Sequence, residues 1–177
     1  MLYDAGARDA SVLVWDRRGG PARRLAPLIG GSPNEPRELR FSPDSRRLLV
    51  PMAQDVLAVH DLAAGTVQSL RPHSGYTRRA VFSPDGALIA SVGGDIGVKL
   101  SEPETLGERS LAGAQALMID VQFSRTGRHL ATVGNDPRAF VWSASELRSD
   151  SWRVPGTGPV HVADAEDAGA TALVRGS

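Results

Sequence analysis

Histidine, serine and aspartate are the residues of this chain that could do nucleophilic or acid–base chemistry. The histidines are His60, His73, His129 and His161. A serine activated by a histidine is the nucleophile of many hydrolases, and Ser74 lies directly beside His73. The chain has no G-x-S-x-G segment, however, and this pair lies in a predicted turn. We therefore expect His73 to be a structural hydrogen-bonding residue and the chain to be no enzyme.

A metal or phosphate site would need ligands at defined spacings. The chain has no cysteine, and its histidines are scattered without paired spacing, so we expect no metal site. GGDIGVK (93–99) contains the one lysine, Lys99. It lacks the G-x-x-x-x-G-K-[ST] spacing and leads into a predicted strand, so we interpret it as a turn and expect no cofactor. Asp9, Asp95 and Asp136 recur at a fixed place in a repeat, which favours loop capping over catalysis.

Composition argues against several classes of partner. The 20 basic and 20 acidic residues cancel, so nothing favours binding to nucleic acid or to an anionic membrane. No apolar run approaches the roughly 18 residues of a membrane helix, and the acidic start is unlike a signal peptide. We expect a soluble, cytoplasmic protein. Nineteen of the basic residues are arginine, which we attribute to a GC-rich bacterial genome.

The elements that would position these residues come from an internal repeat. Its copies are RFSPDSRRLLV (40–50), VFSPDGALIAS (81–91) and QFSRTGRHLAT (122–132). Their phenylalanines, Phe41, Phe82 and Phe123, are 41 residues apart. A second anchor follows each of them by 19 residues, at His60, Ser101 and Trp142, and VLVWD (12–16) with Trp15 is an earlier copy. This period, with several short strands per unit, is typical of a β-propeller.

Each unit is predicted to contain four strands. The first ends at the phenylalanine, and Ser-Pro-Asp-Gly (83–86) then turns the chain. Gly86 and Gly127 suit a positive φ there, whereas Ser45 is a poorer choice. We expect Leu48, Ile89 and Leu130 of the second strands to be equivalent. The expected interior pairs of the third strands are Val12/Val14, Leu57/Val59, Val98/Leu100 and Ala139/Val141. More polar fourth strands are expected in 65–70 and 107–111, at the outer edge.

Over roughly residues 1–155 the chain resembles the WD-repeat β-propeller family. In that family a His, a Ser or Thr, an Asp and a Trp form a hydrogen-bonded network. The resemblance places the His at Ser32, His73 and Ala114, and the Ser or Thr at Val50, Ser91 and Thr132. It places the Asp at Asp9, Gln54, Asp95 and Asp136, and the Trp at Trp15, His60, Ser101 and Trp142. The third copy matches best, with His73, Ser91 and Asp95 but Ser101 in the place of the tryptophan.

The fold class that follows is all-β, with propeller blades of four antiparallel strands and about four repeats. We assign 1–177 to a single propeller segment. Its parts are a partial blade at 1–30, repeats at about 31–71, 72–112 and 113–154, and a degenerate partial blade at 155–177.

Ring closure is left with three alternatives, because a propeller must close to cover its edges. The chain is a piece of a longer propeller, which we favour. Alternatively, it closes with four blades, 159–164 supplying the first strand of the blade begun at 2–28. In the third alternative, two copies join, and we expect self-association through open blade edges.

The resemblance implies a non-catalytic scaffold that presents loops to protein or peptide partners. The loops before the first and third strands would form the docking face, with Tyr76, Arg78, Gln54 and Asn135 as candidate contacts. The alternative is a regulatory or sensor propeller attached to an enzyme, such as a bacterial kinase, a nucleotide-switch ATPase or a peptidase. Its catalytic part would lie outside this chain.

Overall fold

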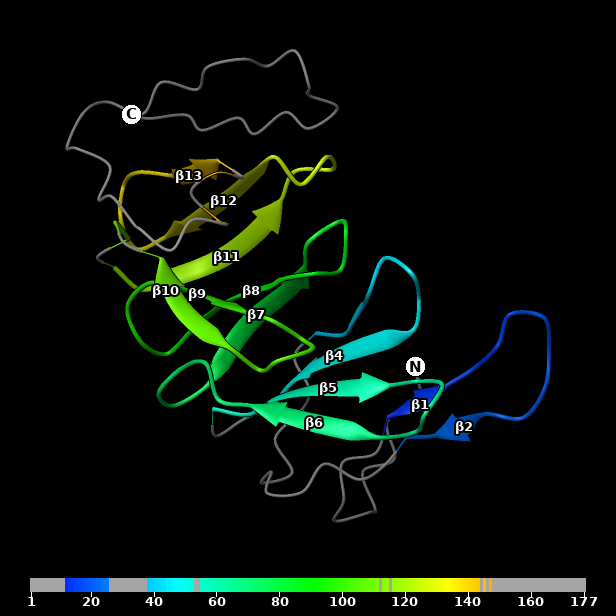
Figure 1. The fold of residues 1–177 in the computed structure, drawn as a ribbon. Coiled ribbons are helices and arrows are strands. Elements are labelled where there is room, and N and C mark those ends of the chain that lie inside the picture. The colour runs from blue at the N-terminus through cyan, green and yellow to red at the C-terminus, as the bar shows by residue number, and fades with distance from the viewer. Residues whose placement is uncertain are drawn as a thin grey trace.

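Short β-strands in four antiparallel sheets make up the fold (Figure 1). The computed structural model describes residues 12–25, 38–52, 55–111, 113–114, 116–143, 145 and 147. Sheet 1 contains β1 (Leu13–Val14) and β2 (Arg23–Arg24). Sheet 2 contains β3 (Arg40–Phe41), β4 (Arg47–Pro51), β5 (Leu57–Asp61) and β6 (Val67–Leu70). Sheet 3 contains β7 (Thr77–Phe82), β8 (Ile89–Gly93), β9 (Val98–Ser101) and β10 (Glu108–Leu111), and sheet 4 contains β11 (Met118–Phe123), β12 (His129–Gly134) and β13 (Phe140–Ser143).

These sheets confirm the predicted all-β architecture. In each sheet the strands pair in chain order, so every sheet is a meander built from one stretch of chain. The registers repeat as well, since Leu48 pairs with His60, Ile89 with Ser101 and Leu130 with Trp142. The fourth strands β6 and β10 lie within the predicted ranges. Residues 1–11 and 148–177, which include the expected strand at 159–164 and the start of the blade expected at 2–28, lie outside the described residues.

The turn after each phenylalanine has the same serine-to-backbone bonds in all three copies, and in two of them the serine also donates to an aspartate. In the third sheet the Ser83 hydroxyl donates to Asp85 Oδ1 at 2.6 Å and accepts from the Leu88 N–H at 2.9 Å. The Gly86 N–H also donates to the Ser83 carbonyl at 2.8 Å. Because this tight turn needs a left-handed residue, φ is +73° at Gly86 and +59° at Ser45. Ser45 therefore carries the backbone strain that its place in the repeat predicts.

The sheets stack face to face, and the core lies between them. One buried cluster joins sheets 2 and 3 and contains Leu49, Val59, Phe82 and Ile89. A larger one joins sheets 3 and 4 around Val98, Phe123 and Trp142. A third joins sheets 1 and 2 around Val12, Leu25 and Leu48. The predicted second-strand anchors Leu48, Ile89 and Leu130 are all at most 1% exposed.

Two core predictions are wrong, both at places where a neighbouring sheet is incomplete or absent among the described residues. Phe41 is 54% exposed, whereas Phe82 and Phe123 are buried against the preceding sheet. Sheet 1, which precedes Phe41, has only two described strands. Val141 is 43% exposed because it lies on the face of sheet 4 that no described sheet covers.

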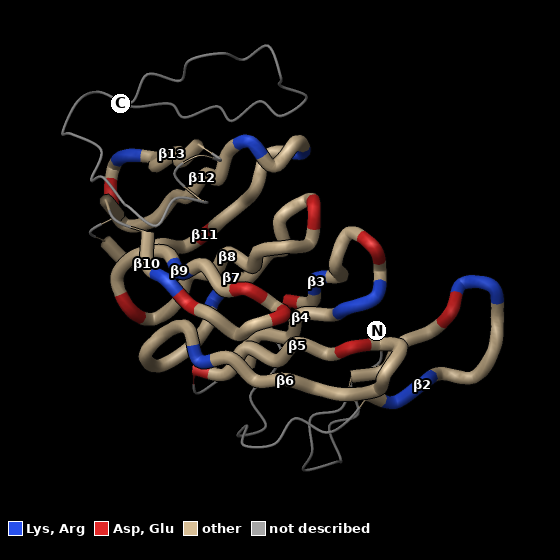
Figure 2. Tube along the Cα trace, in the orientation of Figure 1, with Lys and Arg blue, Asp and Glu red and all other residues tan. Residues whose placement is uncertain are grey.

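Charged residues are concentrated on particular turns and edges (Figure 2). The β1–β2 hairpin carries four exposed arginines, Arg17, Arg18, Arg23 and Arg24. No helix among the described residues is long and apolar enough to cross a membrane.

Candidate functional site

A hydrogen-bonded triad lies at one end of sheet 3. His73, which precedes β7, has its Nε2 atom 3.0 Å from the Ser91 hydroxyl in β8. Its Nδ1 atom bonds the carboxylate of Asp95 in the β8–β9 loop. The second oxygen of that carboxylate accepts the Ser74 N–H at 3.2 Å. The His, Ser and Asp that the sequence singles out in this copy are therefore brought together in space.

His73 and Ser91 are buried, and the backbone around them is tightly packed. The His73 side chain is 0% exposed, and Ser91 is fully buried. A Cβ atom added at Gly93 would come within 2.6 Å of the His73 side chain and within 2.3 Å of the Tyr76 carbonyl oxygen. Gly134, one period later, lies equally close to the Leu117 carbonyl. Glycine at this position lets the strand pass close to the preceding loop. The recurrence of glycine at Gly93 and Gly134, 41 residues apart, is visible in the sequence.

The electrostatics of the triad favour an ionised aspartate. Partial burial acts to raise the pKa of the Asp95 carboxyl, but the hydrogen bonds from His73 and the Ser74 N–H lower it below the ordinary value. A charged carboxylate in contact with a buried imidazole holds that ring in one orientation. The serine hydroxyl is buried at the other ring nitrogen, so this arrangement fixes a loop and presents no exposed nucleophile.

The fourth member of the family network is absent from this sheet. Ser101 takes the tryptophan place, is 1% exposed and has no hydrogen-bond partner for its hydroxyl. At the same place in sheet 2, His60 is 1% exposed and its Nε2 atom lacks a partner. Burial lowers the pKa of His60. His60 is thus a buried residue of the core, and its lowered pKa favours the neutral ring.

Among the described residues, the copy in sheet 4 does not rebuild the network. In sheet 4 the Thr132 hydroxyl contacts Met118 Sδ at 3.6 Å, because Ala114 stands where a histidine would be. Asp136 instead binds the Arg138 guanidinium at 2.9 and 3.0 Å, which lowers the pKa of the carboxyl. Trp142 is buried and stacks on the Phe140 ring at 5.9 Å. Trp15 is 51% exposed, and Asp9 lies outside the described residues.

The loops around the triad form a surface at the same end of the sheets. Tyr76 is half-buried and its carbonyl accepts the Gly94 N–H at 2.8 Å, while the Asn135 N–H donates to Leu117 at 2.9 Å one repeat later. A β-bridge between Ile96 and Leu117 joins the two loops. Ile96 is 63% exposed and was missed by the sequence reasoning. Its position directly after the triad aspartate was the available signal.

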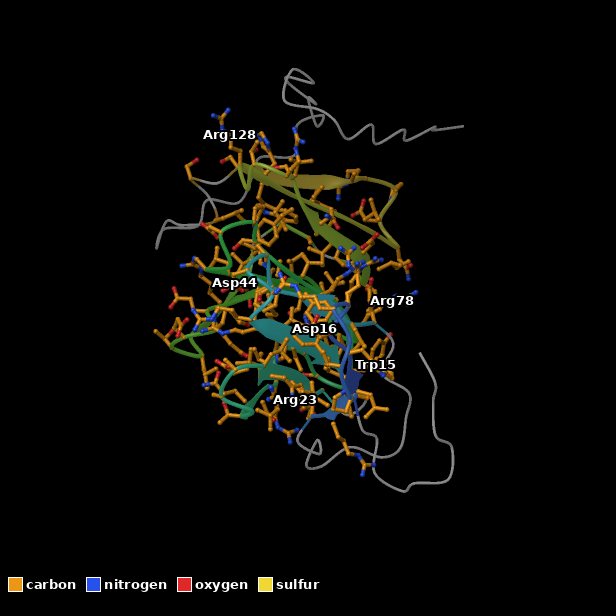
Figure 3. All side chains as sticks on the ribbon, turned by 90° about the vertical axis from the view of Figure 1, so that its right-hand side faces the viewer. Trp15, Asp16, Arg23, Asp44, Arg78 and Arg128 are labelled. Atoms are coloured by element: carbon orange, nitrogen blue, oxygen red, sulfur yellow. The ribbon has the colours of Figure 1, made fainter. Side chains whose placement is uncertain are left out.

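The remaining candidates differ in exposure. Arg78 is half-buried, and Asn135 is exposed. Figure 3 marks Arg78 on the side of the molecule that carries Trp15. Gln54 lies outside the described residues. Tyr76, Arg78 and Asn135 remain predictions as partner contacts.

A ladder of ion pairs crosses three sheets at one repeat position. Glu38, Arg79 and Asp120 are each 41 residues apart. Arg79 Nη2 lies 3.0 Å from Glu38 Oε1, and its Nε lies 3.0 Å from Asp120 Oδ1. Arg40 also pairs with Glu38. Alternating charges therefore join the segment before β3 to the first strands of sheets 3 and 4. The sequence analysis singled out Arg78 and did not find Arg79.

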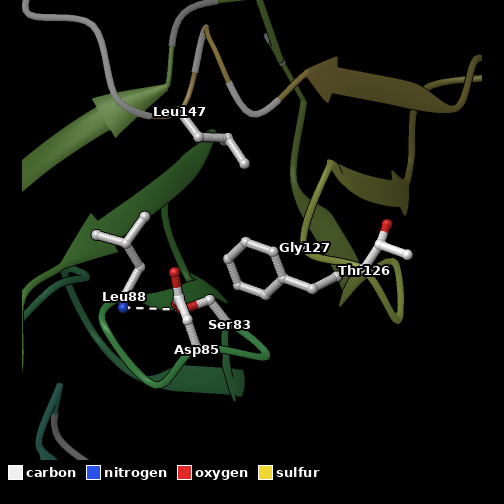
Figure 4. A pocket seen from close by; sticks show the side chains of 7 residues that line it. Ser83, Asp85, Leu88, Thr126, Gly127 and Leu147 are labelled. Carbon is white, nitrogen blue, oxygen red and sulfur yellow. Dashed lines mark hydrogen bonds between the residues drawn. The ribbon is translucent and has the colours of Figure 1, made fainter.

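Hollows between the described residues are small. One of about 60 Å³ lies between the turns of sheets 3 and 4 and is lined by Ser83, Leu88, Phe123 and Leu147 (Figure 4). It is far below the several hundred Å³ of a typical small-molecule site. Within the described residues, no group of three or more His, Asp or Glu side chains is placed to hold a metal ion.

Comparisons with known proteins agree with this architecture. No family model matches the chain. The WD repeat-containing protein slr1409 of Synechocystis sp. is 32% identical over 85 residues, which are 48% of this chain and 26% of that protein. The WD repeat-containing protein SL1-17 of Schistosoma mansoni is 26% identical over 141 residues, covering 56% of this chain and 46% of that protein. The chain thus spans less than half the length of either relative.

Proposed function

We propose that this chain, a segment of the WD-repeat β-propeller type, serves as a non-catalytic scaffold that binds protein or peptide partners. The observation that carries the proposal is the fixed loop surface beside the triad. His73 and Asp95 hold the β8–β9 loop in place, and that loop exposes Ile96 to 63%. An apolar side chain held out by a rigid loop can contact a partner with little loss of conformational entropy.

The neighbouring residues supply the polar and aromatic parts of such a surface. Tyr76 and Ile96 flank the triad, and Asn135 lies in the equivalent loop of sheet 4. Tyrosine and arginine are frequent anchors at protein interfaces, with apolar residues around them. We accordingly assign Tyr76, Ile96, Arg78 and Asn135 to the partner-binding surface.

A displayed library of random peptides tests this assignment. Peptides selected on the wild-type chain should bind the Ile96→Asp variant at least about tenfold more weakly, because a charge there would be buried without a partner. Leu106→Asn is the matched control, since Leu106 is 39% exposed in the β9–β10 turn at the other end of β9. Selected peptides that bind both variants equally well would contradict this location of the site.

A further inference from the structure

One face of sheet 4 is covered by no other sheet among the described residues, whereas the same face of sheets 2 and 3 is covered. Residues of β12 alternate between exposed and buried along the strand, whereas every residue of β8 is buried. Val133 is 45% exposed and Val141 is 43% exposed. Both lie on the face opposite to Trp142 and Leu130, since side chains alternate along a strand. This face, formed by Ala131, Val133 and Val141, is called the valine face.

In the preceding repeats the residues equivalent to the valine face are buried. One period before Val133 and Val141 lie Val92 and Leu100, which are 0% and 1% exposed. One period before Leu100 lies Val59, which is 3% exposed. In both cases the cover is the next sheet along the chain, as the buried clusters between neighbouring sheets show. The valine face therefore has the geometry and the side chains of a surface made for a further sheet.

At the opposite end of the stack, sheet 1 has the kind of face that in sheets 2 to 4 packs on the preceding sheet. No described sheet lies against this face of sheet 1. Trp142 belongs to the residues with which sheet 4 covers sheet 3, and it is 2% exposed. Trp15 occupies the same place in the repeat directly after β1, yet it is 51% exposed (Figure 3). Val14, on the other face of sheet 1, packs toward sheet 2. The outer face of sheet 1, formed by Leu13 and Trp15, is called the tryptophan face.

We infer that a second copy of this chain docks head to tail, its tryptophan face packing on the valine face of the first copy. Sheet 1 lies at the other end of the stack from β13 (Figure 1), so the described sheets of each copy carry both halves of an interface that neighbouring repeats form internally. The contact joins different surfaces of the two copies, so successive copies add in one direction and end in a ring or an open chain. The inference rests on the stacking of the sheets and is independent of the proposed function.

Sedimentation of the purified chain and two variants tests this docking. The wild type should have at least twice the mass of one chain. Trp15→Asp removes the tryptophan face and leaves the valine face intact, whereas Val141→Lys does the reverse. Each variant alone should be a monomer, and an equal mixture should form a dimer that grows no further, because the two surviving faces meet once. Leu106→Lys, on neither face, should associate like the wild type.

The equal mixture of Trp15→Asp and Val141→Lys, together with the mass of the wild type, can contradict the proposed docking. Circular dichroism and thermal unfolding serve to check that both variants fold. We expect that they do, because Trp15 and Val141 are exposed. A monomeric wild type that Val141→Lys destabilises would place another segment of the same chain on the valine face and overturn the inference. Variants that associate like the wild type, or a mixture that stays monomeric, would overturn it as well.

Discussion

At the scale of single residues, His60 shows how a repeat position is filled when its usual residue is missing. An imidazole is smaller than an indole but still aromatic, so it fills the core at the place where Trp142 lies in sheet 4. The buried ring has an unpartnered nitrogen and a lowered pKa. A buried group of this kind costs stability and makes it dependent on pH.

We expect the free energy of unfolding to fall as the pH drops below about 6.5, the ordinary pKa of a histidine. The unfolded chain takes up a proton on His60 from that pH downward, whereas the folded chain does so only at lower pH. His60→Phe should keep the aromatic volume and flatten this dependence. Urea titrations between pH 5 and pH 8 measure it, and identical pH slopes for both chains would contradict the assignment.

Ser45 supports a second prediction at this scale. A side chain at φ +59° costs about 1 kcal/mol, whereas glycine does not pay this cost. Ser45→Gly removes this strain, but glycine loses more backbone entropy on folding, which offsets part of the gain. We therefore expect a net stabilisation of about 0.5 to 1 kcal/mol. Gly86→Ser is the matched reverse change and should destabilise. Thermal unfolding of both variants measures the effect, and a destabilised Ser45→Gly would contradict it.

At the scale of the sheets, the repeated phenylalanine has two different roles. Phe82 is buried between sheets 2 and 3, while Phe41 is 54% exposed. Phe82→Ala should cost about 3 to 5 kcal/mol because it leaves a cavity. Phe41→Ala should cost less than about 1 kcal/mol, because an exposed side chain leaves none. Equal losses in a denaturant titration would contradict the register of the stack.

This difference marks what a sequence pattern can and cannot predict. The turn at 83–86 follows from local chemistry, because Pro, Asp and Gly each favour its backbone, and it was predicted correctly. Phe41 and Val141 occupy places that are buried in other repeats. Their exposure depends on whether a neighbouring sheet covers them, and a periodic pattern does not contain that information.

The same reasoning applies to the candidate site. His73, Ser91 and Asp95 were predicted together because three matching types occupy one repeat. Asp136 was expected in a similar network but pairs with Arg138, two residues away, since its repeat supplies no histidine. A network residue can be predicted only when its partners are present.

At the scale of the whole molecule, the stack has a direction. Each sheet offers one face to the sheet before it and a different face to the sheet after it. The two outer faces are therefore unlike each other, and an assembly of identical copies can follow the same rule that orders the sheets within one chain.

The ion pairs between repeats also depend on the order of the sheets. Glu38, Arg79 and Asp120 alternate in sign along the stack, so each repeat matches only neighbours of opposite charge. Loss of the middle repeat by recombination would place two carboxylates against each other, which is unfavourable. Near-identical turns make the repeats look interchangeable, but these three residues make a deletion or a shuffled order costly.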